Sequence, residues 1–529
     1  MNAITGWFEH PLFKWGDADT FLQMQEVLAA NVTKERITAL LEPFKNVFFE
    51  DVTFYPKGTY SEPEKTVLDN IDDFYLIRMK HLISENHTGT MRVYLPVKWN
   101  GRFMGMAGAG SNNEVDWFTS VRFNVISWPM ALFNGYAGVV ADNDTGIRLD
   151  CTWGFDRDGR LEWDHIESWA YETPHLMTLV GKTLTRALYG REIIASYMHG
   201  TSGGGRQVIT EALFYPGDYD GLWADGPSIN YLSLMFSCLW APVVEANEKH
   251  IVALSKYKKA FELAVANPRL QDVPFDSREM VWMDFIHSLR GLMTEDGPIT
   301  QRDLDVMVKT WDGPFTKGGK RMGYGFGPAI QQWPLPANNP LYGYLKRRDD
   351  GRLVLMPIAE QTLRWFTGNP SLDIHQLTYE EFERIYTDLR KKFIRYDFND
   401  CDFTAFAARG GKLIITHGTG DCVVPYQGII DYYGKCLEYF PSEKIMNRSV
   451  RLYMPYLAGH SILDWSGGAV SISDGMKYLT AWAEDGKEPD TLPTVHYDFT
   501  NDSAVSRSEV ASFEQWRFRK HFLDRTKER

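Results

Sequence analysis

The segment from Gly200 to Gly204 reads Gly-Thr-Ser-Gly-Gly and places one serine among closely spaced glycines. It matches the pattern G-x-S-x-G, in which the serine occupies a sharp turn between a strand and a helix and exposes its hydroxyl as a nucleophile. An apolar run, IIASYM, precedes the segment, and apolar residues recur at helical spacing after it. We therefore interpret Ser202 as a candidate nucleophile. The alternative is a glycine-rich turn with a capping serine.

A nucleophilic serine needs a general base and a carboxylate that orients this base, and in one common arrangement the chain order is serine, acid, histidine. Asp421 lies in the loop of LIITHGTGDCVVP, and His460 follows the next predicted strand in YLAGHS. We predict that Asp421 is the acid and His460 the base. His417 is an alternative base, although its position at a strand end favours a structural role. Three aspartates follow the serine too closely to act as the acid and are expected in turns or caps: Asp218, Asp220 and Asp225.

An oxyanion hole requires backbone N–H groups aimed at the negative charge that develops on the substrate. The amide of Gly203, next to the serine, is the first candidate. The glycine-rich run GMAGAG ends at residue 110 and offers a second donor from Gly108, Ala109 or Gly110. A flexible exit from a strand is the alternative interpretation of this run.

The elements that must position these residues follow from hydrophobic periodicity. A helical pattern covers residues 20–44, and three short β-branched and aromatic runs follow it before residue 98. Strand and helix patterns then alternate, which is typical of a parallel α/β sheet. Helical patterns and long loops interrupt the alternation before it resumes. We predict an α/β-hydrolase fold with a mostly parallel central sheet, in four parts: an N-terminal helix and sheet edge (1–97), a first core part (98–233), an inserted lid (234–396) and a second core part with a C-terminal tail (397–529).

Composition narrows the class of ligand. The chain of 529 residues has a net charge of −13, which disfavours nucleic acid and anionic membranes as partners. Its five cysteines form no CxxC pair, so we expect reduced thiols and no zinc site. No signal-like segment and no apolar window of membrane-spanning length are found. We expect a cytoplasmic protein that acts on a small molecule without a metal or cofactor, and the oligomeric state stays open.

The predicted lid contains the candidate substrate contacts. Trp282, Tyr324 and Phe326 would suit a flat or bulky apolar ligand, although the lid's own core would have the same composition. Lys317 and Lys320, in GPFTKGGKRMGYG, are candidates for binding a substrate carboxylate or phenolate. A solvated basic loop is the alternative for these two lysines.

The quoted stretches resemble, in the same order, segments of the tannase and feruloyl esterase family of α/β-hydrolases. The resemblance extends over LPVKWNGRFMGMAGAG, GYAGVVADNDTG, SYMHGTSGGGRQ, YPGDYDGLWADGP, GGKLIITHGTGDCVVP and GHSILDW. It implies hydrolysis of carboxylic esters, commonly of aromatic acids, through an acyl-enzyme. It also supports Ser202, Asp421 and His460 as the catalytic residues, with a lid inserted between the serine and the acid.

Two features depart from the family pattern. Members usually carry cysteines directly before the serine and directly after the histidine, joined in a disulfide, whereas Thr201 and Ser461 stand here. Many members also carry an Asp-rich calcium loop in the lid, and no such loop is found between Leu234 and Tyr396. We expect a divergent serine esterase. An acyltransferase that uses the same acyl-enzyme and a non-catalytic ligand-binding protein are the alternatives.

Overall fold

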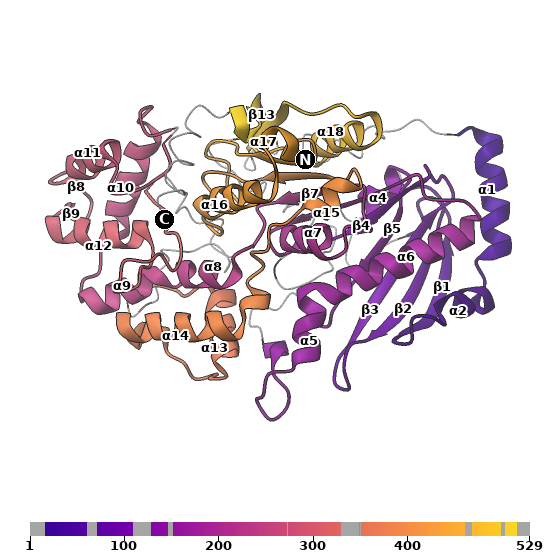
Figure 1. Ribbon diagram of the computed structural model, residues 1–529, viewed down its shortest axis with the longest axis horizontal. Coiled ribbons are helices and arrows are strands. Elements are labelled where there is room, and N and C mark those ends of the chain that lie inside the picture. Colours follow the sequence, from indigo (N-terminus) through magenta and orange to yellow (C-terminus); the bar gives the residue numbers. More distant parts are fainter. Residues whose placement is uncertain are drawn as a thin grey trace.

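A nine-stranded sheet forms the centre of the molecule (Figure 1). The computed structural model describes residues 16–60, 71–108, 110, 128–145, 152–271, 273–328, 349, 351–460, 468–498 and 503–515. The sheet has the order β1-β2-β3-β5-β4-β6-β7-β10-β11. Its strands are β1 (Val47–Tyr55), β2 (Phe74–Leu82), β3 (Thr88–Pro96), β4 (Arg102–Met106), β5 (Ala137–Ala141), β6 (Ala195–Thr201), β7 (Gly221–Asp225), β10 (Lys412–Thr416) and β11 (Val450–Tyr453).

Strand direction divides the sheet into two parts. The strands β1, β2, β3 and β5 pair antiparallel, and every pairing from β5 through β4, β6, β7 and β10 to β11 is parallel. The predicted α/β-hydrolase fold with a mostly parallel central sheet is confirmed. The carboxyl ends of β6 and β10 lie at one edge of the parallel part, so residues that follow them come close together.

Successive side chains along a strand point to opposite faces of the sheet, and each face is covered by its own hydrophobic core. Val139 and Leu222 pack into the core under α6 (Thr173–Tyr189) and α7 (Gly203–Phe214), whereas Val140 and Trp223 pack into the core under α4 (Trp128–Phe133) and α18 (Ile472–Asp485). The first core continues into the helices between β7 and β10. Strands buried on both faces explain why their sequences are nearly continuous apolar runs.

The first helical pattern forms two helices, α1 (Ala18–Asn31) and α2 (Lys34–Leu41), and the expectation of a single helix is wrong. Thr33 separates them in an extended conformation, and its hydroxyl accepts a hydrogen bond from the Arg36 N–H at 3.3 Å. Threonine is a preferred N-cap because its side chain satisfies an amide that has no partner inside the helix. Both helices lie against α6.

The chain forms a helical region after β7 and before β10. In space this region lies beside the parallel part of the sheet, to the left in Figure 1. Among the described residues of this region, none belongs to a strand of the central sheet. A two-stranded hairpin, β8 (Met293–Thr294) and β9 (Gly297–Pro298), interrupts the helices. The helices are α8 (Tyr231–Cys238), α9 (Trp240–Glu248), α10 (Leu254–Val265), α11 (Met280–Leu289), α12 (Gln301–Asp312), α13 (Pro357–Thr367) and α14 (Tyr379–Lys392).

The chain after the helical region completes the sheet and its coverage. Its helices are α15 (Thr404–Ala408), α16 (Tyr426–Cys436) and α17 (Glu443–Met446), followed by α18. A hairpin of β12 (Thr491–Asp498) and β13 (Ser503–Ala511) was not expected from the sequence. The boundaries of the four predicted parts stay predictions. No described helix combines the length and the apolar character that crossing a membrane requires.

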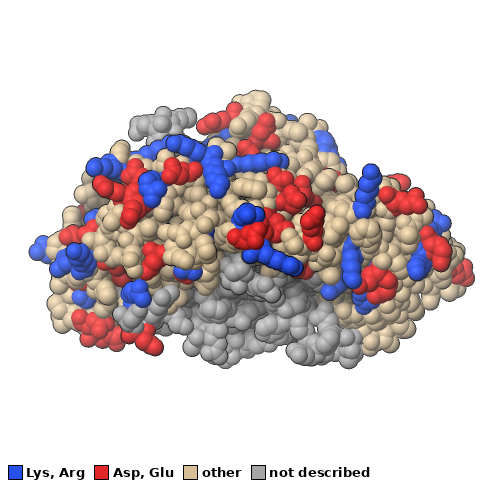
Figure 2. Space-filling view, turned by 90° about the horizontal axis from the view of Figure 1, so that it is seen from below, with Lys and Arg blue, Asp and Glu red and all other residues tan. Residues whose placement is uncertain are grey.

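Acidic and basic side chains are intermixed over the described residues of one face of the molecule (Figure 2). Among the described residues of that face, no extended basic surface of the kind that binds a phosphate backbone is visible.

Candidate active site

Ser202 forms the turn between β6 and α7. Its backbone angles, φ 59° and ψ −118°, lie in a region that residues other than glycine rarely adopt. The turn is held from two sides: the Ser202 N–H donates to the carbonyl of Asp225 at 2.9 Å, and the Ser202 carbonyl accepts from the Ser228 N–H at 3.0 Å. The structure thus has the strand, strained turn and helix that the G-x-S-x-G pattern predicts, with Ser202 partly exposed.

The glycines beside Ser202 allow a neighbouring loop to approach. A Cβ atom on Gly204 would lie 2.0 Å from the carbonyl oxygen of Gly108, and one on Gly203 would lie 2.0 Å from the carbonyl oxygen of Gly110. Any side chain at either position would therefore displace the loop after β4. Glycine is required here by contact with the loop.

Asp421 and His460 form a buried pair after β10 and β11. The His460 Nδ1 lies 2.7 Å from Asp421 Oδ2, and the other carboxylate oxygen accepts the N–H groups of Val423 and Val424 at 2.7 and 2.8 Å. Both side chains are almost fully buried, at 4% and 0% exposure for His460 and Asp421. Burial alone would raise the pKa of Asp421, but the interactions with His460, His417 and the Val424 amide outweigh it and lower this pKa.

The protonation of His460 depends on two carboxylates. Burial alone would lower its pKa, but the negative charges of Asp421 and Asp225 outweigh burial and raise the pKa above the ordinary value. Because Nδ1 faces Asp421, Nε2 is the nitrogen left to exchange a proton with a substrate or with Ser202. His460 thus has the arrangement of a general base oriented by an acid.

His417, the alternative base, lies behind the acid. Its Nε2 is 2.9 Å from the carbonyl of Val424 and 3.4 Å from Asp421 Oδ2, and the ring is fully buried. Burial lowers its pKa. This position supports a structural role for His417, as expected.

The loop after β7 joins the serine to the acid and base. Asp225 accepts the Ser202 amide, and a Cβ atom on the next residue, Gly226, would lie 3.3 Å from His460 Nδ1 and 3.5 Å from Asp421 Oδ2. The Ser202 hydroxyl contacts the same loop through Ser228 Oγ at 3.3 Å. The three predicted catalytic residues are therefore gathered around one short loop.

Three residues of this site were missed as functional. Asp225 supports the turn through its carbonyl and binds the hydroxyls of Thr416 and Thr201 at 2.6 and 3.4 Å. Ser228 contacts the nucleophile, and Gln207 holds the loop after β4. The stretch YPGDYDGLWADGP, which resembles the family, was the available signal for Asp225, and Ser228 follows this stretch directly. Thr201 takes part in this network, whereas Ser461 lies outside the described residues.

The predicted oxyanion donors differ in their surroundings. Gly203 is the first residue of α7, and the first amides of a helix have no partner inside it. The Gly108 N–H donates to the Gln207 side chain at 3.1 Å, so this amide is used for positioning the loop. Gly110 lies against Gly203, and Ala109 lies outside the described residues. Gly203, Ala109 and Gly110 stay predicted donors.

A cavity of about 740 Å³ lies between α8, α16 and the loop after α12. It is lined by Lys320 and Tyr324, two of the five predicted substrate contacts, and also by Ile229 and Val424. Ile229 follows Ser228, and Val424 binds Asp421, so this cavity adjoins the site although Ser202 and His460 do not line it. Basic side chains dominate its charged lining: Arg278, Lys320, Arg321, Arg390 and Lys435, against one acid, Asp431.

The other three predicted contacts lie away from this cavity. Trp282 and Phe326 are each 2% exposed and belong to the core of the helical region, where the Trp282 Nε1–H donates to backbone carbonyls. Both also line a smaller cavity with Tyr426. Lys317 is exposed, and its ammonium lies 3.7 Å from Glu380. The core interpretation is thus supported for the two aromatic residues.

Comparison with known proteins agrees with this geometry. The model of the family "Tannase and feruloyl esterase" matches residues 84–522. A "Probable feruloyl esterase" of Arthroderma benhamiae is 27% identical over 420 residues, which cover 76% of this chain and 74% of the relative. Two solved structures have the same fold. The tannin acyl hydrolase of Aspergillus niger has a TM-score of 0.74, 17% identity and 92% coverage of both chains, and feruloyl esterase B of Aspergillus oryzae has a TM-score of 0.70, 18% identity and coverage of 90% and 95%.

The family match covers the serine turn, the helical region and the buried acid and base, and with them every element that the preceding geometry brings together. This chain belongs to the tannase and feruloyl esterase family of carboxylic ester hydrolases.

Proposed function

We propose that this protein is a serine esterase that hydrolyses esters of aromatic acids, with Ser202, His460 and Asp421 as its catalytic residues. The observation that carries the proposal is the buried Asp421–His460 pair beside a serine on a strained turn. In the first step the Ser202 oxygen attacks the ester carbonyl carbon while His460 Nε2 takes the hydroxyl proton. Gly203 and the loop after β4 stabilise the oxyanion.

The remaining steps use the same groups, with His460 acting first as an acid and then again as a base. His460 gives its proton to the leaving alcohol as the carbon–oxygen bond breaks, and the acyl group stays on Ser202. Water then loses a proton to His460 and attacks the acyl carbon, which releases the acid and restores the serine. Asp421 keeps its negative charge throughout and stabilises the imidazolium. Before attack, the Ser202 hydroxyl must turn from Ser228 to His460, as catalytic hydrogen bonds often tighten on substrate binding.

The cavity supports aromatic acyl groups that carry acidic or phenolic substituents. Phe315, Tyr324 and Tyr386 offer aromatic surface, and the basic lining favours negative charge. The names of the relatives, feruloyl esterase and tannin acyl hydrolase, point in the same direction.

A substrate panel tests the proposal. Methyl esters of hydroxylated aromatic acids should be hydrolysed at higher kcat/KM than methyl esters of aliphatic acids of similar size. A fluorophosphonate probe should label Ser202, and products formed with added alcohols distinguish hydrolysis from acyl transfer. An enzyme that is not labelled, or that favours aliphatic esters, would contradict the proposal.

A pair of lysine variants tests the cavity. Lys320→Met should raise KM for a hydroxylated aromatic ester by up to about fivefold, since an exposed charge contributes about 0.2–1 kcal/mol. Lys317→Met is the matched control, because this lysine lies in the same loop but does not line the cavity. Equal changes of KM in the two variants would contradict the proposal that this cavity binds the substrate.

The expected cytoplasmic location stays a prediction. The described cysteines, Cys238, Cys401, Cys422 and Cys436, are free thiols. Millimolar dithiothreitol is therefore expected to leave activity unchanged.

A further inference from the structure

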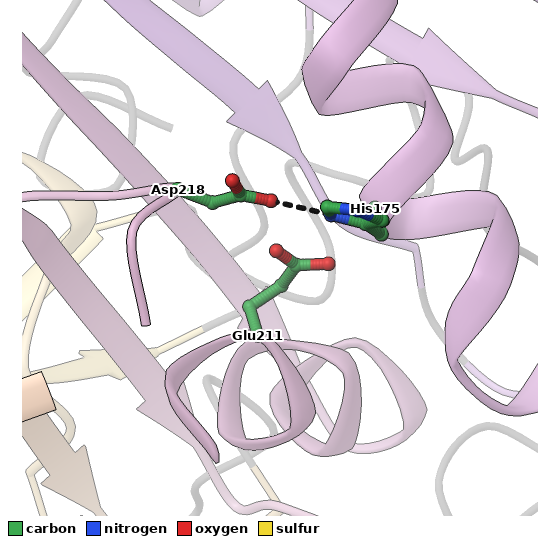
Figure 3. Close-up of side chains that lie close together, drawn as sticks. All are labelled: His175, Glu211 and Asp218. Atoms are coloured by element: carbon green, nitrogen blue, oxygen red, sulfur yellow. Dashed lines mark hydrogen bonds and ion pairs between the residues drawn. The ribbon is translucent and has the colours of Figure 1, made fainter. Parts of the chain in front are cut away.

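A second polar cluster lies outside the proposed active site, at the other end of α7. It consists of His175 near the start of α6, Glu211 in the last turn of α7 and Asp218 in the turn before β7 (Figure 3). One potential ligand atom from each residue lies within 4.8 Å of the others. Figure 3 shows the Glu211 carboxylate pointing toward Asp218 and His175.

Glu211 distinguishes this cluster from an ordinary group of ion pairs. The residue is 1% exposed, and neither carboxylate oxygen has a hydrogen-bond partner among the described residues. His175 Nδ1 lies 2.7 Å from Asp218 Oδ2, and the Lys182 ammonium donates to the Asp218 carbonyl, so both neighbouring donors contact Asp218 instead of Glu211. An ionised carboxylate buried without a partner is strongly unfavourable.

Two arrangements would satisfy Glu211. In the first, a proton is shared with the neighbouring Asp218 carboxylate, in keeping with burial and the charge and side-chain contact of Asp218, which raise the pKa of Glu211 above its ordinary value. A divalent cation would instead bind both carboxylates and His175 together and satisfy the ionised form. Asp218 and His175, at 13% and 26% side-chain exposure, lie on the side that solvent reaches.

We infer that His175, Glu211 and Asp218 form a binding site for one divalent first-row transition metal ion, with Zn²⁺ as the representative case. One imidazole nitrogen and two carboxylates suit Zn²⁺, whereas Ca²⁺ prefers six to eight oxygen ligands. The three ligand atoms lie within 4.8 Å of one another, and His175 Nδ1 and Asp218 Oδ2 are hydrogen-bonded at 2.7 Å, so a bound ion would replace that hydrogen bond and draw the Glu211 carboxylate toward the other two ligands.

The geometry of the cluster favours its assembly. The His175 ring stacks on Tyr215 with centroids 3.5 Å apart and an interplanar angle of 4°, which fixes its orientation. The three ligands come from α6, α7 and the turn before β7, so a bound ion would clamp the end of the helix that begins beside Ser202. The expectation of no metal rested on the absence of CxxC pairs and of an Asp-rich loop in the lid, whereas this cluster uses a histidine and two carboxylates of the core.

Zinc binding by the full-length protein tests the inference. After treatment with EDTA and removal of the chelator, the protein is titrated with Zn²⁺ in equilibrium dialysis, and Co²⁺ absorption provides a second readout. We expect about one equivalent to bind, and Glu211→Gln to weaken binding at least about 100-fold, because loss of a ligand should exceed the 10- to 100-fold typical of outer-shell changes. Zinc should also raise the Tm of the wild type but not of this variant.

His250→Gln is the matched control, because His250 is also paired with an aspartate and similarly exposed, at 24%, but lies elsewhere. It should bind zinc like the wild type. If circular dichroism shows that Glu211→Gln does not fold, His175→Gln replaces it with the same expected loss. Absence of saturable binding at micromolar Zn²⁺, or unchanged binding in the cluster variants, would overturn the inference and assign a shared proton to Glu211 and Asp218. The test needs no turnover, so its result is independent of the proposed esterase activity.

Discussion

Two buried carboxylates lie near opposite ends of α7 and differ in their hydrogen-bond partners and in the direction of their pKa shifts. Asp421, beside the start of the helix, is 0% exposed and accepts bonds from His460, Val423 and Val424. Glu211, in its last turn, is 1% exposed and has no donor among the described residues. Correspondingly, the pKa of Asp421 is lowered and that of Glu211 is raised.

This comparison shows that partners, and not burial, decide whether a carboxylate inside a protein keeps its charge. Asp421 is surrounded by groups of the chain that stabilise its negative form, so it can orient and stabilise a histidine. Glu211 has no hydrogen-bond donor among the described residues, so its negative form lacks the support that Asp421 receives. Variants at and around the two positions should therefore have effects of very different size.

The largest effect is expected for the nucleophile itself. Ser202→Ala should lower kcat on an aromatic ester by several orders of magnitude with an unchanged circular dichroism spectrum, because only oxyanion and binding contributions remain. Ser228→Ala, which removes the neighbouring hydroxyl, should lower kcat by no more than about tenfold. Near wild-type turnover by folded Ser202→Ala protein would contradict the assignment of Ser202 as the nucleophile.

Asp421→Asn should come next, with a loss of kcat of up to about 10⁴-fold and less than that of His460→Ala. It should also change the pH profile of kcat/KM. His460 must be neutral to act as base, and its raised pKa means that activity is lost as pH falls through a value above about 6.5. Without the Asp421 charge this pKa falls, so the acidic limb should move to lower pH. If the acidic limb of the kcat/KM profile does not move, the Asp421 charge does not control the pKa of His460.

The glycines at the start of α7 allow a test of local packing. Gly204→Ala should destabilise the protein by about 1–3 kcal/mol in urea unfolding, since its Cβ would lie 2.0 Å from the Gly108 oxygen. Gly217→Ala is the control, because no atom lies within 4 Å of a Cβ there. Similar stability losses in the two variants would mean that the loop after β4 moves away without difficulty.

The smallest effect is expected at Glu211 in the absence of metal. Glu211→Gln in EDTA should change the free energy of unfolding by no more than about 1 kcal/mol, because the raised pKa of Glu211 favours the neutral acid, which an amide resembles in shape and polarity. Turnover should stay near the wild-type value. A loss above about 3 kcal/mol would show that the ionised carboxylate has a partner within the chain, and the comparison with Asp421 would fail.

The positions of the proposed catalytic residues were predictable because each follows a strand of recognisable periodicity. Ser202 directly follows β6, and Asp421 and His460 lie in the loops after β10 and β11. Residues that matter through three-dimensional neighbours were not predictable in this way. Glu211 belongs to an ordinary helical pattern, and its burial depends on how α6 packs on α7.

Aromatic residues of the lid illustrate a second limit. Trp282 and Tyr324 have the same character in sequence, yet Trp282 lies in the core of the helical region and Tyr324 lines the cavity. Hydrophobic composition does not distinguish a residue packed by its own domain from one available to a ligand. The split between α1 and α2 was missed for a local reason, the capping geometry of Thr33.

The order of the strands has a consequence for biosynthesis. β7 ends at Asp225, but its partner β10 begins only at Lys412, after the whole helical region has been made. At about 5–20 residues per second, translation of the intervening chain takes on the order of ten seconds or more. During this interval the nascent β7 has an open edge, which is the kind of surface that pairs with other chains. Early folding of the helical region over this edge would protect the emerging polypeptide from aggregation.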